Sequence, residues 1–207
     1  MIKSSLLGLF VPTFFFVSAT PGLCMTFALS LGMTIGVRRT LWMMAGELVG
    51  VALVALATIA GVATIMLAYP EIFMIFKLVG GAYLAFLGVQ LWQSRGEMAI
   101  TQETSRPDLM TRTQLATRGF VTAIANPKGW AFFVALLPPF IDYQLPITPQ
   151  IIILLLLMLT IEFICLIAYA SGGRLLSSFL KNRSNVNLIN RIAGSLIISV
   201  AIWLSLS

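Results

Sequence analysis

The chain contains no histidine, and only 2 of its 207 residues are cysteines. Without histidine it has neither the usual ligands of a zinc site nor a histidine-based catalytic triad. Cys24 and Cys165 each lack a CxxC partner, so we expect buried, unreactive thiols rather than a disulfide framework or a redox centre. The sequence therefore predicts no metal site, no cofactor and no enzymatic activity.

Charge is also scarce. Charged residues make up 10% of the chain and hydrophobic residues 59%, whereas an average soluble domain has roughly 25% charged residues. A soluble globule of this size exposes more surface than so few polar groups can cover. This composition excludes a disordered chain and a collagen-like fibre, and it argues against a cytosolic domain.

Six stretches are long and apolar enough to cross a lipid bilayer as helices, since a span needs about 20 mostly apolar residues. They are residues 6–36, 41–68, 72–92, 117–141, 147–170 and 188–206. A cleavable signal peptide ending near Ala19 is an alternative for the first stretch, but apolar sequence continues well beyond that residue. The sequence predicts an all-α integral membrane protein with six transmembrane helices.

The basic residues gather in the loops between spans one and two, three and four, and five and six. They are Arg38, Arg39, Arg95, Arg106, Arg112, Arg118, Arg174, Lys181, Arg183 and Arg191. The positive-inside rule places these loops in the cytoplasm and both termini outside it, with Lys3 as the exception. The net charge of +6 is then a topology signal with a contribution from lipid headgroups, so we expect no nucleic acid partner.

A polar stretch over residues 93–114 divides the chain into three spans and three spans. We therefore expect a first three-helix repeat over 1–93, a cytoplasmic linker over 94–116 and a second three-helix repeat over 117–207. An odd number of spans in each half gives the halves opposite orientations. Two inverted repeats of this kind are common in secondary transporters.

Each half also interrupts its first span with a proline. The first half carries Thr20, Pro21 and Gly22, and the second carries Asn126, Pro127, Lys128 and Gly129. Proline removes a backbone donor, and glycine loosens the chain further. Interruptions at corresponding places point to a transport site. Ordinary proline kinks, which membrane helices tolerate, are the alternative.

Two acidic residues lie inside predicted spans, where a charge costs several kcal/mol. Glu47 and Glu162 each lie about two turns from the cytoplasmic end of their spans, so they could face one cavity. Each could receive a substrate ammonium or carry a proton in apolar surroundings. The alternative is that each pairs with a nearby lysine, arginine or backbone group.

Lys128 admits several interpretations. It could attract a substrate carboxylate together with the free N–H groups at the start of a half-helix. It could instead neutralise Glu47 or Glu162, or keep the break hydrated. Trp130 lies beside this break and could line the site. Gly88, with other small residues of the third span, favours close helix packing within one chain or in a homodimer.

Several segments together resemble the LysE/RhtB family of amino-acid exporters. Residues 18–22 are similar to its first signature, with Leu23 where a second proline is usual. Residues 119–129 and 137–140 are similar to its second signature, and 77–84, Gly88 and 190–194 match its third and last spans. The resemblance implies six spans in two inverted repeats, a bacterial inner-membrane location and export of small amino acids driven by the proton gradient.

These observations predict a secondary active exporter of small amino acids or related zwitterionic metabolites, working by proton antiport and alternating access. A passive efflux channel is the alternative. The substrate carboxylate would meet a half-helix N-terminus, and its ammonium would meet an acidic side chain. The predicted substrate-binding and coupling residues are Pro21, Gly22, Glu47, Asn126, Pro127, Lys128 and Glu162.

Overall fold

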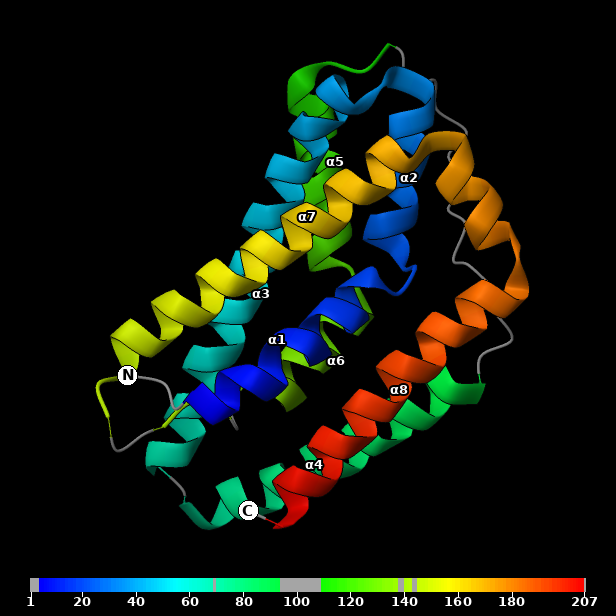
Figure 1. Cartoon of the computed structure of the whole chain (residues 1–207). Helices are drawn as coiled ribbons and strands as arrows, with labels where there is room; N and C mark the ends of the chain where they lie inside the picture. The colour runs from blue at the N-terminus through cyan, green and yellow to red at the C-terminus, as the bar shows by residue number, and fades with distance from the viewer. Residues whose placement is uncertain (1–3, 69, 94–108, 138–139, 143–144, 207) are drawn as a thin grey trace.

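The computed structural model describes residues 4–68, 70–93, 109–137, 140–142 and 145–206. Its regular elements in this part of the chain are helices, with no strand among them (Figure 1). They are α1 (Ser4–Ala19), α2 (Leu23–Ile35), α3 (Val37–Ala68), α4 (Pro70–Gln93), α5 (Arg112–Ile124), α6 (Pro127–Leu136), α7 (Ile147–Lys181) and α8 (Arg183–Leu206). The predicted all-α fold is confirmed.

Three described segments are long and apolar enough to cross a membrane: Val37–Gly61, Ile147–Gly173 and Arg183–Ile202. A fourth span results if the bent pair Gly8–Ala19 and Leu23–Ile35 is counted as one. The predicted total of six spans, their inverted-repeat relation and the outward position of both termini stay predictions. The linker predicted over 94–116 falls largely on residues 94–108, which lie outside the described part.

The first predicted break is present between α1 and α2, whose axes bend by 55°. The backbone N–H of Thr20 still donates to the carbonyl of Phe16 at 3.0 Å, and its hydroxyl donates to the same carbonyl at 2.8 Å. Pro21 has no N–H to continue the ladder, and Gly22 is extended at the N-cap of α2 without a side-chain cap. The helix therefore ends at Ala19 and restarts at Leu23.

The second break separates α5 from α6 and has a more regular cap. The side-chain oxygen of Asn126 accepts a hydrogen bond from the backbone N–H of Lys128 at 3.1 Å, which is the usual work of an N-cap residue. Pro127 opens α6, where its missing N–H costs nothing. The predicted stretch 117–141 is thus two short helices, and the helical part stops at Leu136.

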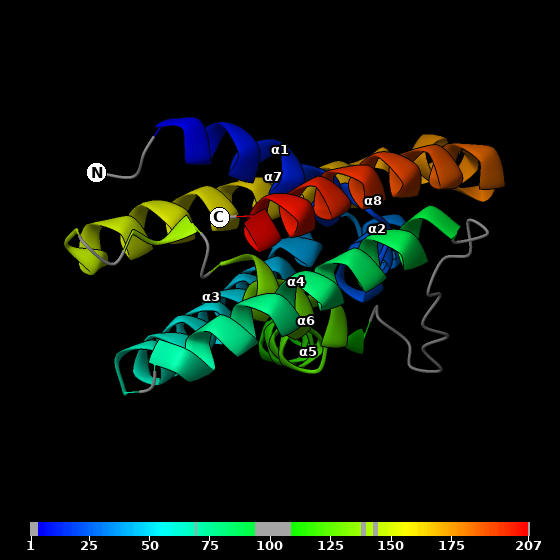
Figure 2. The ribbon, with the colours of Figure 1, turned by 90° about the horizontal axis from the view of Figure 1, so that it is seen from below.

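The helices α4 and α8 pack along each other, as both views show (Figures 1 and 2). A Cβ atom added to Gly88 would lie 2.9 Å from the carbonyl oxygen of Gly194, so the two backbones touch at this crossing. At the same crossing the Arg191 guanidinium lies 5.1 Å from the ring centre of Trp92. The packing role predicted for Gly88 is confirmed within the chain.

The α3 and α5 backbones meet even more closely near the ends at which both helices begin. A Cβ atom on Gly46 would overlap the backbone of Ala116, and one on Gly119 would overlap the carbonyl of Met43. We call this contact between α3 and α5 the glycine seam. The end of the bundle at which both helices begin is called the basic end, because Arg38, Arg39 and Arg112 lie there. The basic end lies toward the top of Figure 1.

A comparable contact joins α2 and α7, where a Cβ atom on Gly32 would overlap the backbone of Ala170. By contrast, a Cβ atom on Gly8, Gly61 or Gly129 would meet nothing within 4 Å. Close backbone contact is therefore confined to particular helix pairs, which are α3 with α5, α2 with α7 and α4 with α8 among the described helices. The start of α1 and the end of α8 lie at the opposite end of the bundle (Figure 1).

The core has two parts. The cluster toward the basic end is built mainly from methionine and leucine, including Met43, Met44 and Leu166. The other is rich in phenylalanine: the ring centres of Phe10 and Phe140 lie 5.0 Å apart. We call the second part the aromatic cluster. The two breaks lie between these two clusters, so the polar groups at the breaks are enclosed by apolar packing on both sides.

The segment predicted as an interfacial helix or connector, 173–187, is helical on both sides of a short turn. It contains a kink at Gly173, whose φ of 44° and ψ of −131° interrupt α7. Glycine adopts a positive φ without a steric penalty. The eighth helix then begins at Arg183, five residues before the predicted start of the last span at Leu188.

Candidate functional site

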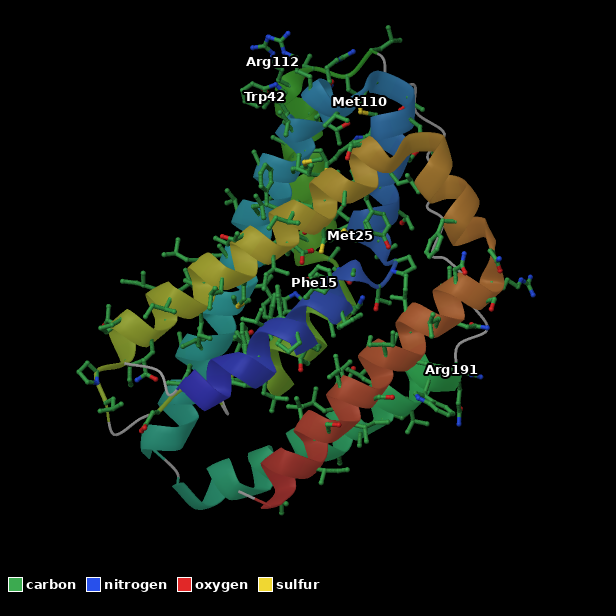
Figure 3. The ribbon with its side chains drawn as sticks, viewed as in Figure 1. Phe15, Met25, Trp42, Met110, Arg112 and Arg191 are labelled. Carbon is green, nitrogen blue, oxygen red and sulfur yellow. The ribbon has the colours of Figure 1, made fainter. Side chains whose placement is uncertain are left out.

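The two breaks meet at a cavity of about 60 Å³ near the middle of the bundle. Met25, which lines it, marks the place in Figure 3. A cavity of this size holds a few water molecules. Its polar lining residues come from five helices or their ends, and they are Ser18, Thr20, Cys24, Glu47, Asn126, Lys128 and Glu162.

Glu47 lies deepest among these groups. Its side chain, on α3, is 0% exposed. Neither carboxyl oxygen has a hydrogen-bond partner among the described residues. A carboxyl group that loses water without gaining a donor forfeits its solvation energy. The Glu47 carboxyl group therefore lacks a hydrogen-bond donor among the described residues, and a bound proton or a cationic group would stabilise it.

Glu162 approaches the cavity from α7 and is half-buried. Its Oε2 accepts a hydrogen bond of 2.6 Å from the hydroxyl of Ser18, in the last turn of α1. A bond this short is typical of a hydroxyl donating to a charged carboxylate. The contact ties α7 to the first break.

The Lys128 side chain reaches from the second break to the first. It stands in the first turn of α6, and its ammonium donates to the carbonyls of Val17 at 2.9 Å and Thr20 at 3.4 Å. These carbonyls belong to the end of α1, where helical partners run out. A lysine at a helix C-terminus also interacts favourably with the helix dipole. Lys128 therefore caps α1, a role that the sequence interpretation did not include.

Asn126 also serves both breaks. While its oxygen caps α6, its amide nitrogen donates to the Cys24 sulfur at 3.7 Å. Cys24 and Cys165 are both buried free thiols, as predicted.

The structure brings Gly22, Glu47, Asn126, Lys128 and Glu162 to one cavity. Pro21 is buried at the first break. The backbone of Pro127 lies at the second break, and its side chain lies outside the described part. The expectation that Trp130 could line the site is wrong. Its ring is 38% exposed and its Nε1 donates to the carbonyl of Ile124 at 2.8 Å, away from the cavity lining.

Sequence reasoning missed two supporting residues, Ser18 and Tyr169. The Tyr169 hydroxyl donates to the carbonyl of Ala19 at 2.8 Å, also at the end of α1. A usable signal was present for it, because Tyr169 follows Glu162 by about two helical turns and therefore shares its face of α7. Ser18 was named only as part of the stretch 18–22 that resembles the first family signature, and no role at the site was assigned to it.

The geometry as a whole is a cavity with partly apolar walls that holds two carboxyl groups and one ammonium. The ammonium is held by backbone carbonyls, and one carboxyl has no partner within the described residues. Such a site can take up a cationic group at Glu47 and Glu162. The N–H groups in the first turn of α6 already donate to the side-chain and backbone oxygens of Asn126, so an anion at this end of the site would meet the positive end of the helix dipole and the Lys128 ammonium.

Comparison with known proteins gives a consistent result. The family model described as LysE type translocator matches residues 15–207. A homoserine/homoserine lactone efflux protein of Salmonella typhi is 32% identical over 133 residues, covering 64% of this chain and 63% of the relative. A leucine efflux protein of Klebsiella pneumoniae is 25% identical over 190 residues, covering 90% and 88%.

An uncharacterized membrane protein of Vibrio cholerae is 26% identical over 188 residues, which cover 91% of this chain and 90% of the relative. No solved structure matches the chain.

Proposed function

The chain belongs to the LysE type translocator family, and we propose that it is a secondary active exporter of small amino acids or related zwitterionic metabolites in a bacterial cytoplasmic membrane. The observation that carries the proposal is the cavity where two broken helices meet beside Glu47, whose carboxyl oxygens have no hydrogen-bond partner among the described residues. The efflux functions named for two relatives support the same class of substrate.

The proposed substrate orientation follows from the charges of the cavity. The substrate ammonium binds between Glu47 and Glu162, since neither oxygen of the Glu47 carboxyl has a hydrogen-bond partner among the described residues. The substrate carboxylate binds at the start of α6, next to the Lys128 ammonium and the positive end of the helix dipole. A zwitterion thus satisfies both ends of the site, whereas a simple cation or anion satisfies one.

Proton coupling follows from competition at one carboxyl. A proton on Glu47 removes the negative charge that holds the substrate ammonium. Protonation from outside the cell therefore releases the substrate, and loss of that proton to the cytoplasm readies the site for the next one. The proton and the substrate need only prefer different conformations for this exchange to drive transport.

The glycine seam supports an assignment of this form to one stage of the proposed cycle. Backbones touch between the cavity and the basic end, which the positive-inside rule assigns to the cytoplasm. In the proposed cycle, this form is closed toward the cytoplasm, and separation of α3 from α5 opens the cavity to it. Rocking of one three-helix half against the other is the motion that inverted repeats allow.

The test is export from proteoliposomes under an imposed proton gradient. Wild-type protein is expected to move amino acids against their own concentration gradient, whereas Glu47→Gln and Glu162→Gln are expected to lose gradient-driven export by at least tenfold. Asp142→Asn is the matched control, since Asp142 does not line the cavity. Export that only equalises concentrations would indicate a channel, and unimpaired uphill export by the Glu47→Gln, Glu162→Gln double variant would refute carboxyl coupling.

A further inference from the structure

A second cavity, of about 420 Å³, lies beside the first. It is bounded by α4 and α8 on one side and by α1 and α6 on the other, since Phe86, Ile197, Val17 and Phe132 all line it. In Figure 1 this is the region between the α1–α6 pair and the α4–α8 pair. Its volume is several times that of the first cavity and lies in the range of small-molecule sites.

The two cavities share a wall. Val17, Lys128 and Phe132 line both of them. The Lys128 ammonium, fixed on two carbonyls of α1, therefore lies at the boundary. A substrate whose carboxylate lies next to Lys128 and whose ammonium points to Glu47 has its remaining substituent facing the larger cavity.

The walls of the larger cavity are mostly apolar. Phe86, Leu87 and Leu91 line it, together with the rings of Tyr83 and Phe132. Gln90 adds one uncharged polar group, and Lys128 is the one charged side chain among its described lining residues.

The α4 side chains that line this cavity still expose much of their surface. Phe86 is 59% exposed and Tyr83 is 41% exposed, so these rings retain area that a ligand can cover. A cationic substituent would find no partner of opposite sign among the described lining residues, and an anionic one would compete with the substrate's own carboxylate for Lys128. A hydrocarbon substituent gains about 0.8 kcal/mol for each CH₂ that it buries.

We propose that this larger cavity is the side-chain pocket of the transport site and selects amino acids with a bulky, uncharged, apolar side chain. The inference rests on the proposed function, because it takes the orientation of the zwitterion from that site. A side chain with three more buried carbons than alanine is then expected to bind roughly 50-fold more tightly, from the same value for each CH₂.

The experiment uses Leu87→Trp, which places an indole in the larger cavity. Val89→Trp is the matched control on the same helix, since Val89 is 43% exposed and does not line the cavity. Binding of leucine, phenylalanine and alanine is measured by the rise in melting temperature of the purified protein, and export of the same three in proteoliposomes. We expect Leu87→Trp to reduce the preference for leucine over alanine by at least tenfold while alanine binding persists.

A second variant keeps the test decisive if Leu87→Trp does not fold. Phe86→Ala removes an exposed wall of the cavity and is expected to reduce the same preference by at least threefold, with Val89→Trp like the wild type. An unchanged preference in both variants, or equal losses for leucine and alanine, would overturn the inference. So would a co-purified lipid that Leu87→Trp displaces and leucine does not.

The two proposals fail separately. Leucine-selective binding without gradient-driven export would contradict the proposed function and keep the pocket assignment. Gradient-driven export without any preference for apolar side chains would contradict the pocket assignment and keep the function.

Discussion

Substitution of Gly46 by alanine tests whether the glycine seam is as close as the backbone positions indicate. The new Cβ atom would overlap the backbone of Ala116 in α5, and a backbone cannot turn aside as a flexible side chain can. Overpacking of this kind costs about 1–3 kcal/mol. The same substitution at Gly61, also on α3, meets nothing within 4 Å and gains up to about 1 kcal/mol of helix propensity.

The two variants should therefore differ in opposite directions from the wild type. Together these terms separate them by about 2–4 kcal/mol. For a chain of 150–250 residues, 1 kcal/mol shifts the melting temperature by about 2–4 °C. We expect Gly46→Ala to melt roughly 5–15 °C below Gly61→Ala, from these same values.

The two buried thiols provide the assay. Cys24 and Cys165 are 5% and 3% exposed, so a dye that fluoresces on reaction with thiols reports unfolding as the temperature rises. Both variants keep both cysteines, which makes the signals comparable. A melting temperature for Gly46→Ala equal to or above that of Gly61→Ala would refute the close contact between α3 and α5.

Three further predictions concern the groups around the breaks. Ser18→Ala removes the 2.6 Å hydrogen bond to Glu162 and should change the KM of export about fivefold, for a loss of about 1 kcal/mol; a KM like that of the wild type contradicts a role at the site. Asn126→Ala removes the cap of α6 and should lower stability by about 1 kcal/mol, whereas Asn126→Ser should restore the melting temperature; equal melting of both variants argues against capping. Tyr169→Phe removes a buried hydrogen bond to the end of α1 and should lower the melting temperature by about 2–4 °C, whereas the exposed Tyr83→Phe should not, and matching shifts would speak against this contact.

The breaks could be predicted because they are local. Pro21 and Pro127 interrupt a helix through their own covalent structure, whatever surrounds them. The approach of Glu47 to Glu162 was also foreseeable, since both lie at one depth of the predicted spans. Depth along a helix follows from the count of residues, and the sequence supplies that count directly.

The hydrogen-bond partners that lie on other helices could not be predicted from the sequence in this way. Lys128 bonds to carbonyls more than 100 residues earlier in the chain, and helix crossing alone brings them together. The seam had a local signal that was missed, because Gly46 and Gly50 are spaced as in the small-residue motif of membrane helices. Such a motif shows that a helix can be approached, but it does not identify the approaching helix.

The smaller cavity is bounded by side chains at one end and by backbone contacts at the other. Toward the aromatic cluster the obstruction consists of side chains, with the rings of Phe14 and Phe132 centred 6.1 Å apart. These rings can turn aside while the backbone stays in place. At the glycine seam there is no side chain to rotate, so a passage there requires whole helices to part, a motion of about microseconds to milliseconds. In the proposed transport cycle, opening toward the basic end therefore needs helices to move, whereas opening toward the aromatic cluster needs the rotation of side chains.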